Sequence, residues 1–140
     1  MNQDGPVIII EDDIDDQEIM TAVFKELNYT NQIYFFSSGY DALEFLNRTD
    51  IIPFLIMSDI NMPLIDGFAL RDKVKMDAKL QVKCIPYLFF TTAASQQAVI
   101  DAYSRSVQGF FVKDNNMEGL RETLDIIMRY WKKCSSPNRF

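Results

Sequence analysis

The sequence of 140 residues contains no histidine and only two cysteines. Without histidine the chain cannot form a Ser-His-Asp or Cys-His catalytic group, bind zinc through imidazole, or carry a phosphohistidine of its own. Cys84 and Cys134 lie far apart in the sequence and match no metal-ligand spacing. We therefore expect a reduced, cytoplasmic protein.

Long apolar runs and clusters of positive charge are also missing. No apolar run reaches the roughly 18 residues that a membrane span needs, and the N-terminus lacks the pattern of a signal peptide. The chain has 14 Lys and Arg against 20 Asp and Glu, a net charge of −6. We expect no contact with membranes, and none with nucleic acid, whose phosphates require clustered Lys and Arg.

The sequence is rich enough in apolar residues to bury a hydrophobic core. Apolar residues make up 48% of the sequence, and 11 residues are Phe. A chain of this length is typical of one domain. We predict a single domain over residues 1–133 and a C-terminal tail over 134–140.

Five short apolar runs alternate with five stretches of helical periodicity. The runs are 7–10, 33–36, 54–58, 85–90 and 109–112. The stretches between them carry apolar residues at helical spacing, whereas 77–83 reads as a polar connection. Asp13, Asp66 and Ser95 are placed to cap helices. The alternation predicts an α/β fold, a doubly wound, five-stranded parallel sheet covered on both faces by five helices.

Polar side chains follow four of the predicted strands, and parallel strands present their carboxyl ends at one edge of a sheet. The residues that would converge there are Glu11, Asp12, Asp59, Thr91 and Lys113. Crowded carboxylates repel one another, and a hard divalent cation such as Mg²⁺ relieves this repulsion through oxygen ligands. A carboxylate can also act as a nucleophile and take a phosphoryl group, whose charge a cation, Lys113 and Thr91 would stabilise.

Each of these residues also has a plainer interpretation on its own. The acidic run 11–13 is typical of a helix cap, and Asp59 precedes a turn. Thr91 could satisfy the end of a strand, and Lys113 could be a surface lysine. Which interpretation applies depends on whether these side chains lie close together in the folded protein.

The set and its order resemble the receiver domain of two-component response regulators. The resemblance rests on the acidic pair after the first strand, the segment D-x-x-M-P-x-x-D-G that begins at Asp59, Thr91 after the fourth strand and Lys113 after the fifth. It covers about residues 7–131. The chain is most similar to a stand-alone, chemotaxis-type receiver, which implies the flavodoxin-like strand order 2-1-3-4-5 and no DNA-binding output domain.

The resemblance implies a phosphoacceptor and a metal site. Asp59 would accept a phosphoryl group from the phosphohistidine of a sensor histidine kinase or a histidine phosphotransfer protein. Mg²⁺ would be held by Glu11, Asp12 and Asp59, together with the backbone carbonyl of Asn61. On this reading the chain catalyses only its own phosphotransfer and dephosphorylation and is not otherwise an enzyme.

The resemblance also implies a switch. Thr91 and Lys113 would contact the phosphoryl group, and the ring of Phe110 would change rotamer as Thr91 moves, although Phe110 also reads as plain core. The face formed by the helix after Ser95, strand 109–112 and the last helix would then bind a downstream protein or pass the phosphate on. We expect a monomer or a weak phosphorylation-linked dimer.

Three positions depart from the family pattern. Asp114 stands where the family usually has a proline joined by a cis peptide; because a non-proline cis bond costs about 3–4 kcal/mol, we predict a trans Lys113–Asp114 bond and a reshaped loop. Thr92 replaces Ala or Gly and narrows access to the phosphoryl site. Phe110 lacks the hydroxyl of a tyrosine, so a switch there would use packing alone.

Two other functions stay open. One is a degenerate receiver that acts as a phosphorylation-independent interaction scaffold; the intact set of site residues argues against it. The other is a small phosphatase with an aspartate nucleophile, which needs a second acid two residues later, where this chain has Asn61. Nucleotide binding is excluded because neither a P-loop nor a Gly-rich dinucleotide turn is present.

Overall fold

The computed structural model describes residues 3–92 and 94–135. Within these ranges five strands form one parallel sheet in the order β2-β1-β3-β4-β5. The strands are β1 (Val7–Ile10), β2 (Ile33–Phe36), β3 (Leu55–Ser58), β4 (Tyr87–Thr91) and β5 (Gly109–Val112). The helices are α1 (Ile14–Glu26), α2 (Gly39–Arg48), α3 (Gly67–Met76), α4 (Ala78–Gln81), α5 (Gln96–Ser104) and α6 (Met117–Lys133). The predicted α/β class and strand order are confirmed.

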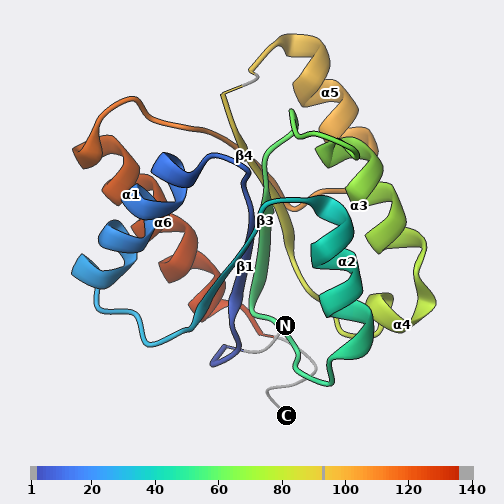
Figure 1. Cartoon of the computed structure of the whole chain (residues 1–140). Helices are drawn as coiled ribbons and strands as arrows, with labels where there is room; N and C mark the ends of the chain where they lie inside the picture. Colours follow the sequence, from blue (N-terminus) through green and yellow to red (C-terminus); the bar gives the residue numbers. More distant parts are fainter. Residues whose placement is uncertain (1–2, 93, 136–140) are drawn as a thin grey trace.

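Helices cover both faces of the sheet. Helices α1 and α6 lie on one face, and α2, α3 and α5 lie on the other (Figure 1). Successive strand residues point to opposite faces, so Ile9 packs toward α1 and α6 whereas Ile10 packs toward α2 and α3. Strands β1, β3 and β4 are buried along their whole length. Burial on both faces explains why their sequences are continuous apolar runs.

The predicted caps begin their helices. The side chain of Asp13 accepts hydrogen bonds from backbone amides in the first turn of α1. Asp66 does the same for α3, with an oxygen-to-nitrogen distance of 2.8 Å, and Ser95 does so for α5 at 3.1 Å. The capping side chains satisfy amides that have no partner within the helix.

The segment 77–83 corrects one prediction. It was expected to be a polar connection, but it contains the one-turn helix α4, so the described residues form six helices rather than five. Asp77 caps this turn by accepting from the backbone amides of Lys79 and Leu80, and Leu80 is buried. A single turn is too short to show helical periodicity, so the sequence pattern missed it.

The strand register brings the predicted polar residues to the same level. Ile10 of β1 pairs with Ser58 of β3, so the residues that follow them leave the sheet side by side. Thr91 pairs with Val112 at the ends of β4 and β5. The carboxyl edge of the sheet therefore collects Glu11, Asp59, Thr91 and Lys113.

The last described helix, α6, ends at Lys133. Residues 136–140 of the predicted tail lie outside the described part of the chain, and the division at residue 133 stays a prediction. No helix in the described ranges combines the length and the apolar character that crossing a membrane would require.

Candidate functional site

Asp59, directly after β3, lies at the centre of the polar cluster. Its Oδ1 accepts hydrogen bonds from the Thr91 hydroxyl at 2.5 Å and from the backbone amide of Ile60 at 2.7 Å. Its Oδ2 lies 3.2 Å from the ammonium nitrogen of Lys113. The side chain is only 12% exposed. Both carboxylate oxygens are thus held by donors that come from three different segments of the chain.

Lys113 reaches from the end of β5 to three carboxylates. Its Nζ contacts Glu11 Oε2 and lies 3.2 Å from Asp59 Oδ2 and 3.3 Å from Asp16 Oδ2. Burial alone would lower the pKa of this lysine, but the hydrogen bond to Glu11 and the charge of Asp59 outweigh it and raise the pKa of Lys113 above its ordinary value. Lys113 is therefore held firmly in its charged form.

Glu11 is the most buried carboxylate of the cluster, with a side chain only 3% exposed. Burial raises its pKa above the ordinary value, the neighbouring Lys113 opposes this shift, and the charge of Asp59 adds to it. Its Oε1 also accepts a hydrogen bond from the backbone amide of Asp13 at 3.1 Å. Glu11 and Asp59 therefore share Lys113 as a cationic partner.

The loop after Asp59 fits closely against the site. A Cβ atom at Gly67 would lie 2.2 Å from the carbonyl oxygen of Asp59, so only glycine allows α3 to start there. The Gly67 amide donates to the carbonyl of Ile60 at 2.8 Å. At the tip of the loop, Leu64 has a φ of 70° and is 85% exposed.

The end of β5 agrees with one expectation. No cis peptide occurs in the described part of the chain, so the Lys113–Asp114 bond is trans as predicted. The Asp114 carboxylate accepts a hydrogen bond from the Thr123 hydroxyl of α6 at 2.8 Å, which turns it toward α6. Phe110 is half-buried, and its ring lies 6.2 Å from that of Phe89. This packing is compatible with both interpretations of Phe110.

Two further residues are predicted to hold the metal, Asp12 through its carboxylate and Asn61 through its backbone carbonyl. Asp12 and Asn61 are exposed, and within residues 3–92 and 94–135 no ion pair or hydrogen bond links either side chain to Lys113 or Asp59. In the same ranges, no three acidic or cysteine side chains are arranged to hold a metal ion together. The donor atoms available at this edge are nonetheless all oxygens, the ligands that Mg²⁺ prefers. The residues fit such an ion, provided that Lys113 moves from between Glu11 and Asp59.

Asp16 is a site residue that the sequence analysis did not identify. It is an acidic residue in the first turn of α1, and its carboxylate contacts Lys113. Its side chain is 40% exposed. Nothing in the local sequence distinguishes it from Asp15, because the contact depends on the fold bringing the first turn of α1 near Lys113 at the end of β5.

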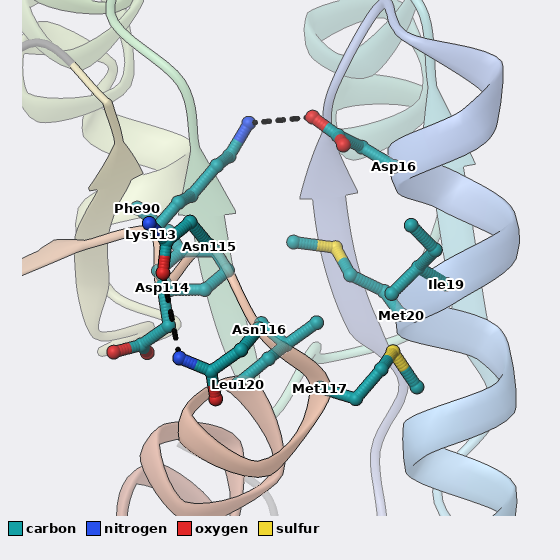
Figure 2. Close-up of a pocket in the computed structure, with 10 residues that line it drawn as sticks. All are labelled: Asp16, Ile19, Met20, Phe90, Lys113, Asp114, Asn115, Asn116, Met117 and Leu120. Carbon is teal, nitrogen blue, oxygen red and sulfur yellow. Dashed lines mark hydrogen bonds and ion pairs between the residues drawn. The ribbon is translucent and has the colours of Figure 1, made fainter.

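A cavity of about 330 Å³ lies between α1 and the segment 113–120 (Figure 2). Lys113 crosses the mouth of this cavity toward Asp16. The apolar side chains of Ile19, Met20 and Met117 face into it. The cavity borders the polar cluster on the side of α1.

The fold and this edge define a doubly wound α/β protein with carboxylates, a hydroxyl and a lysine gathered at the carboxyl ends of its strands. A family model for the response regulator receiver domain matches residues 7–125. The chain belongs to this family. The resemblance inferred from the sequence is thereby confirmed, and the protein is a receiver domain of two-component signalling.

Named relatives agree with this assignment. The chain is 26% identical over 129 residues to the probable methanogenesis regulatory protein FilR2 of Methanothrix harundinacea, covering 89% of this chain and 82% of that protein. It is 28% identical over 127 residues to the chemotaxis protein CheY-3 of Vibrio cholerae, covering 91% of this chain and 94% of the relative.

Solved structures share the fold. The phosphorylated cyanobacterial phytochrome response regulator RcpA superposes with a TM-score of 0.83 at 20% identity, covering 94% of this chain and 96% of RcpA. The Mn²⁺-bound response regulator Rcp1 gives 0.80 at 24% identity, covering 93% and 96%. The receiver domain of the histidine kinase PA1611 of Pseudomonas aeruginosa, with magnesium in its active-site cleft, gives 0.75 at 18% identity, covering 92% and 98%. Related folds therefore hold divalent ions.

Proposed function

We propose that the protein is a phosphorylation-switched signalling receiver that accepts a phosphoryl group on Asp59. The donor would be the phosphohistidine of a sensor kinase or of a phosphotransfer protein. The observation that carries the proposal is the arrangement around Asp59, where Thr91 lies 2.5 Å from one carboxylate oxygen and Lys113 lies 3.2 Å from the other. Both groups can donate hydrogen bonds to the negatively charged oxygens of a phosphoryl group on Asp59.

The chemistry is a transfer between two nucleophiles. A carboxylate oxygen of Asp59 forms a bond to phosphorus while the bond from phosphorus to the donor imidazole nitrogen breaks, and the electron pair returns to that nitrogen. Thr91 and Lys113 hold the oxygens that carry the developing charge. Attack of water on the acyl phosphate later returns inorganic phosphate and free Asp59, and apart from these two steps the protein is not an enzyme.

We propose Mg²⁺ as the cofactor, held by Glu11, Asp12, Asp59 and the backbone carbonyl of Asn61. The all-oxygen donor set and the divalent ions of Rcp1 and the PA1611 receiver support this assignment. When bound, the ion supplies positive charge that neutralises phosphoryl oxygens. The protein's own part is to orient the Asp59 carboxylate and to keep Lys113 charged.

We propose that the output is protein binding or phosphate relay through the face of α5, β5 and α6, in a monomer or a weak phosphorylation-linked dimer. Large apolar side chains are exposed on these elements, namely Ile100, Tyr103, Val112, Ile126 and Tyr130. Phe110 would link this face to Thr91, which lies one strand away on β4. Exposed apolar groups that gather on one face are typical of a protein interface.

The scaffold alternative receives some support from the position of Lys113. With its ammonium between Glu11 and Asp59, the site resembles a closed ion-pair cluster that could serve stability alone. The phosphatase alternative receives none, because Asn61 occupies the position of its second acid and is exposed. Phosphorylation and scaffolding are separated by a direct test.

The test is treatment of the purified protein with Mg²⁺ and a small phosphoryl donor, or with beryllofluoride. We expect wild type to gain the mass of one phosphoryl group and to shift the amide NMR signals of β4, α5 and β5. Asp59→Asn should do neither. Asp66→Asn is the matched control, because it makes the same change at an exposed cap where Asn also serves. Identical responses of wild type and Asp59→Asn would overturn the proposal.

A further inference from the structure

Among the carboxylates that contact Lys113, Asp16 lies outside the set that we propose for the metal and the phosphoryl group. Glu11 and Asp59 come from the sheet edge and are 3% and 12% exposed, whereas Asp16 comes from the first turn of α1 and is 40% exposed. Its oxygen lies 3.3 Å from the ammonium nitrogen. This third contact needs an explanation of its own.

We propose that Asp16 is a positioning residue that retains Lys113 when Glu11 and Asp59 turn their oxygens to a divalent cation. The inference rests on the proposed function. The ammonium now lies between Glu11 and Asp59, where the cation's charge would be needed. Two positive groups at the same oxygens repel each other, so Lys113 must shift. A buried ammonium without a carboxylate partner is costly, and Asp16 supplies that partner.

The structure provides room for this shift on the side of Asp16. The cavity between α1 and segment 113–120 is lined by both Lys113 and Asp16 and by the apolar side chains of Ile19, Met20 and Met117 (Figure 2). The lysine stem can bury its methylene groups there while the ammonium stays with the carboxylate. The adjacent Asp114 does not compete for the ammonium, because its carboxylate accepts from Thr123 on α6.

The setting of Asp16 suits a carboxylate that gains and loses a partner. Its side chain is partly exposed to water, so the carboxylate stays solvated when Lys113 contacts Asp59 or a phosphoryl oxygen instead. It also lies in the first turn of α1, where the helix dipole favours negative charge. Asp16 is therefore placed where Lys113 can approach it or leave it without burying the carboxylate.

The first measurement is Mg²⁺ affinity by calorimetry on wild type, Asp16→Asn and Asp15→Asn. Asp15 is the matched control, because it is exposed in the same helical turn and forms no ion pair with Lys113 in the described part of the chain. Both variants remove the same charge. We expect Asp16→Asn to weaken Mg²⁺ binding about fivefold and Asp15→Asn less than about twofold.

A double-mutant cycle with Lys113→Met then tests whether Asp16 acts through Lys113. In the Lys113→Met background we expect tighter Mg²⁺ binding, and Asp16→Asn should cost no more there than Asp15→Asn. Equal losses from the two Asp variants in the wild-type background, or a loss from Asp16→Asn that persists without Lys113, would overturn the inference. Wild type that fails to bind Mg²⁺ would overturn the proposed metal site as well, so the two failures are distinguishable.

An NMR measurement follows Lys113 itself. We expect its side-chain signals to shift on Mg²⁺ addition in wild type and to keep slow exchange of the ammonium protons with water. In Asp16→Asn the same addition should speed that exchange, while melting temperature in the absence of Mg²⁺ changes little. Unchanged exchange in both proteins would contradict a role for Asp16 in retaining the ammonium.

Discussion

Two buried lysines in different regions of the molecule have opposite surroundings. Lys113, at the carboxyl edge of the sheet, meets the carboxylates of Glu11, Asp59 and Asp16. Lys83, before β4, donates to the backbone carbonyl oxygens of Leu46, Thr49 and Ile51 at 3.1 to 3.4 Å. Both ammonium groups are hydrogen-bonded, Lys113 directly to carboxylates and Lys83 to these backbone carbonyl oxygens.

The surroundings shift the two lysine pKa values in opposite directions. Burial, and secondarily the neighbouring Lys79, lowers the pKa of Lys83 by more than the charges of Asp50 and Asp77 raise it. At Lys113 the carboxylates reverse the effect of burial. Lys83 ties the chain after α2 to the segment before β4, which is a structural role. Lys113 sits among groups that can exchange partners, which is what a reacting site requires.

The largest expected difference between the two lysines is in phosphoryl uptake. We expect Lys113→Met to slow phosphorylation of Asp59 by a small donor about 100-fold, because a charged donor to the phosphoryl oxygens is lost. Lys83→Met should leave the rate unchanged. Intact-protein mass spectrometry over time measures both rates. Equal rates for the two variants would remove the functional distinction between these regions.

The second difference is in stability. Lys83→Met removes a donor shared by three backbone carbonyls, and we expect a loss of about 1–3 kcal/mol in the free energy of unfolding. Denaturant titration at pH 7 measures this loss. Lys83→Arg is the control, since it keeps a charged donor at the same position. A Lys83→Met variant as stable as wild type would show that water molecules replace the lysine as hydrogen-bond donors to these carbonyl oxygens.

The third difference is the sign of the alkaline pH dependence. The folded pKa of Lys113 lies above 10.5, so its stabilising contribution is complete below that pH and falls as pH rises through the folded value. The folded pKa of Lys83 lies below 10.5, so between the two values the unfolded state binds more protons and stability rises with pH.

We therefore expect wild type to lose stability relative to Lys113→Met above about pH 10.5. Relative to Lys83→Met, wild type should gain stability as pH approaches that value from below. Denaturant titrations of the three proteins at a series of alkaline pH values measure both differences. If both differences in the free energy of unfolding changed with pH in the same direction, the surroundings of the two lysines would be more alike than their contacts indicate.

The smallest expected effect concerns Glu11. Its folded pKa is raised above 4.5, so the ionised group destabilises the fold as pH rises through the folded value. We expect Glu11→Gln to be more stable than wild type at pH 7, with the difference disappearing toward pH 4.5, where wild type is also protonated. Thermal melting across this range is the measurement, and a variant less stable at pH 7 would show that the contact with Lys113 outweighs burial.

Much of the candidate site followed from position in the chain alone. Glu11, Asp59, Thr91 and Lys113 each follow a strand, and a parallel sheet must bring such residues to one edge. Their convergence was therefore predictable from apolar runs and spacing. The hydrogen-bond partners of each side chain were harder to predict. The side chains of Asp12 and Asn61 are exposed and lie outside the hydrogen-bonded cluster, and the roles predicted for the Asp12 carboxylate and the Asn61 backbone carbonyl at a metal stay predictions.

Sequence patterns were sufficient to predict the α/β class, the five strands, the caps Asp13, Asp66 and Ser95, and the edge of the sheet at which the polar residues gather. These depend on local periodicity and on a rule that holds for every parallel sheet. Tertiary structure alone decided that α4 forms, that Asp114 turns to Thr123 and that Lys113 is shared with Asp16. These contacts depend on which groups the packing of distant segments brings within reach of a long charged side chain. Local sequence patterns carry no information about such neighbours.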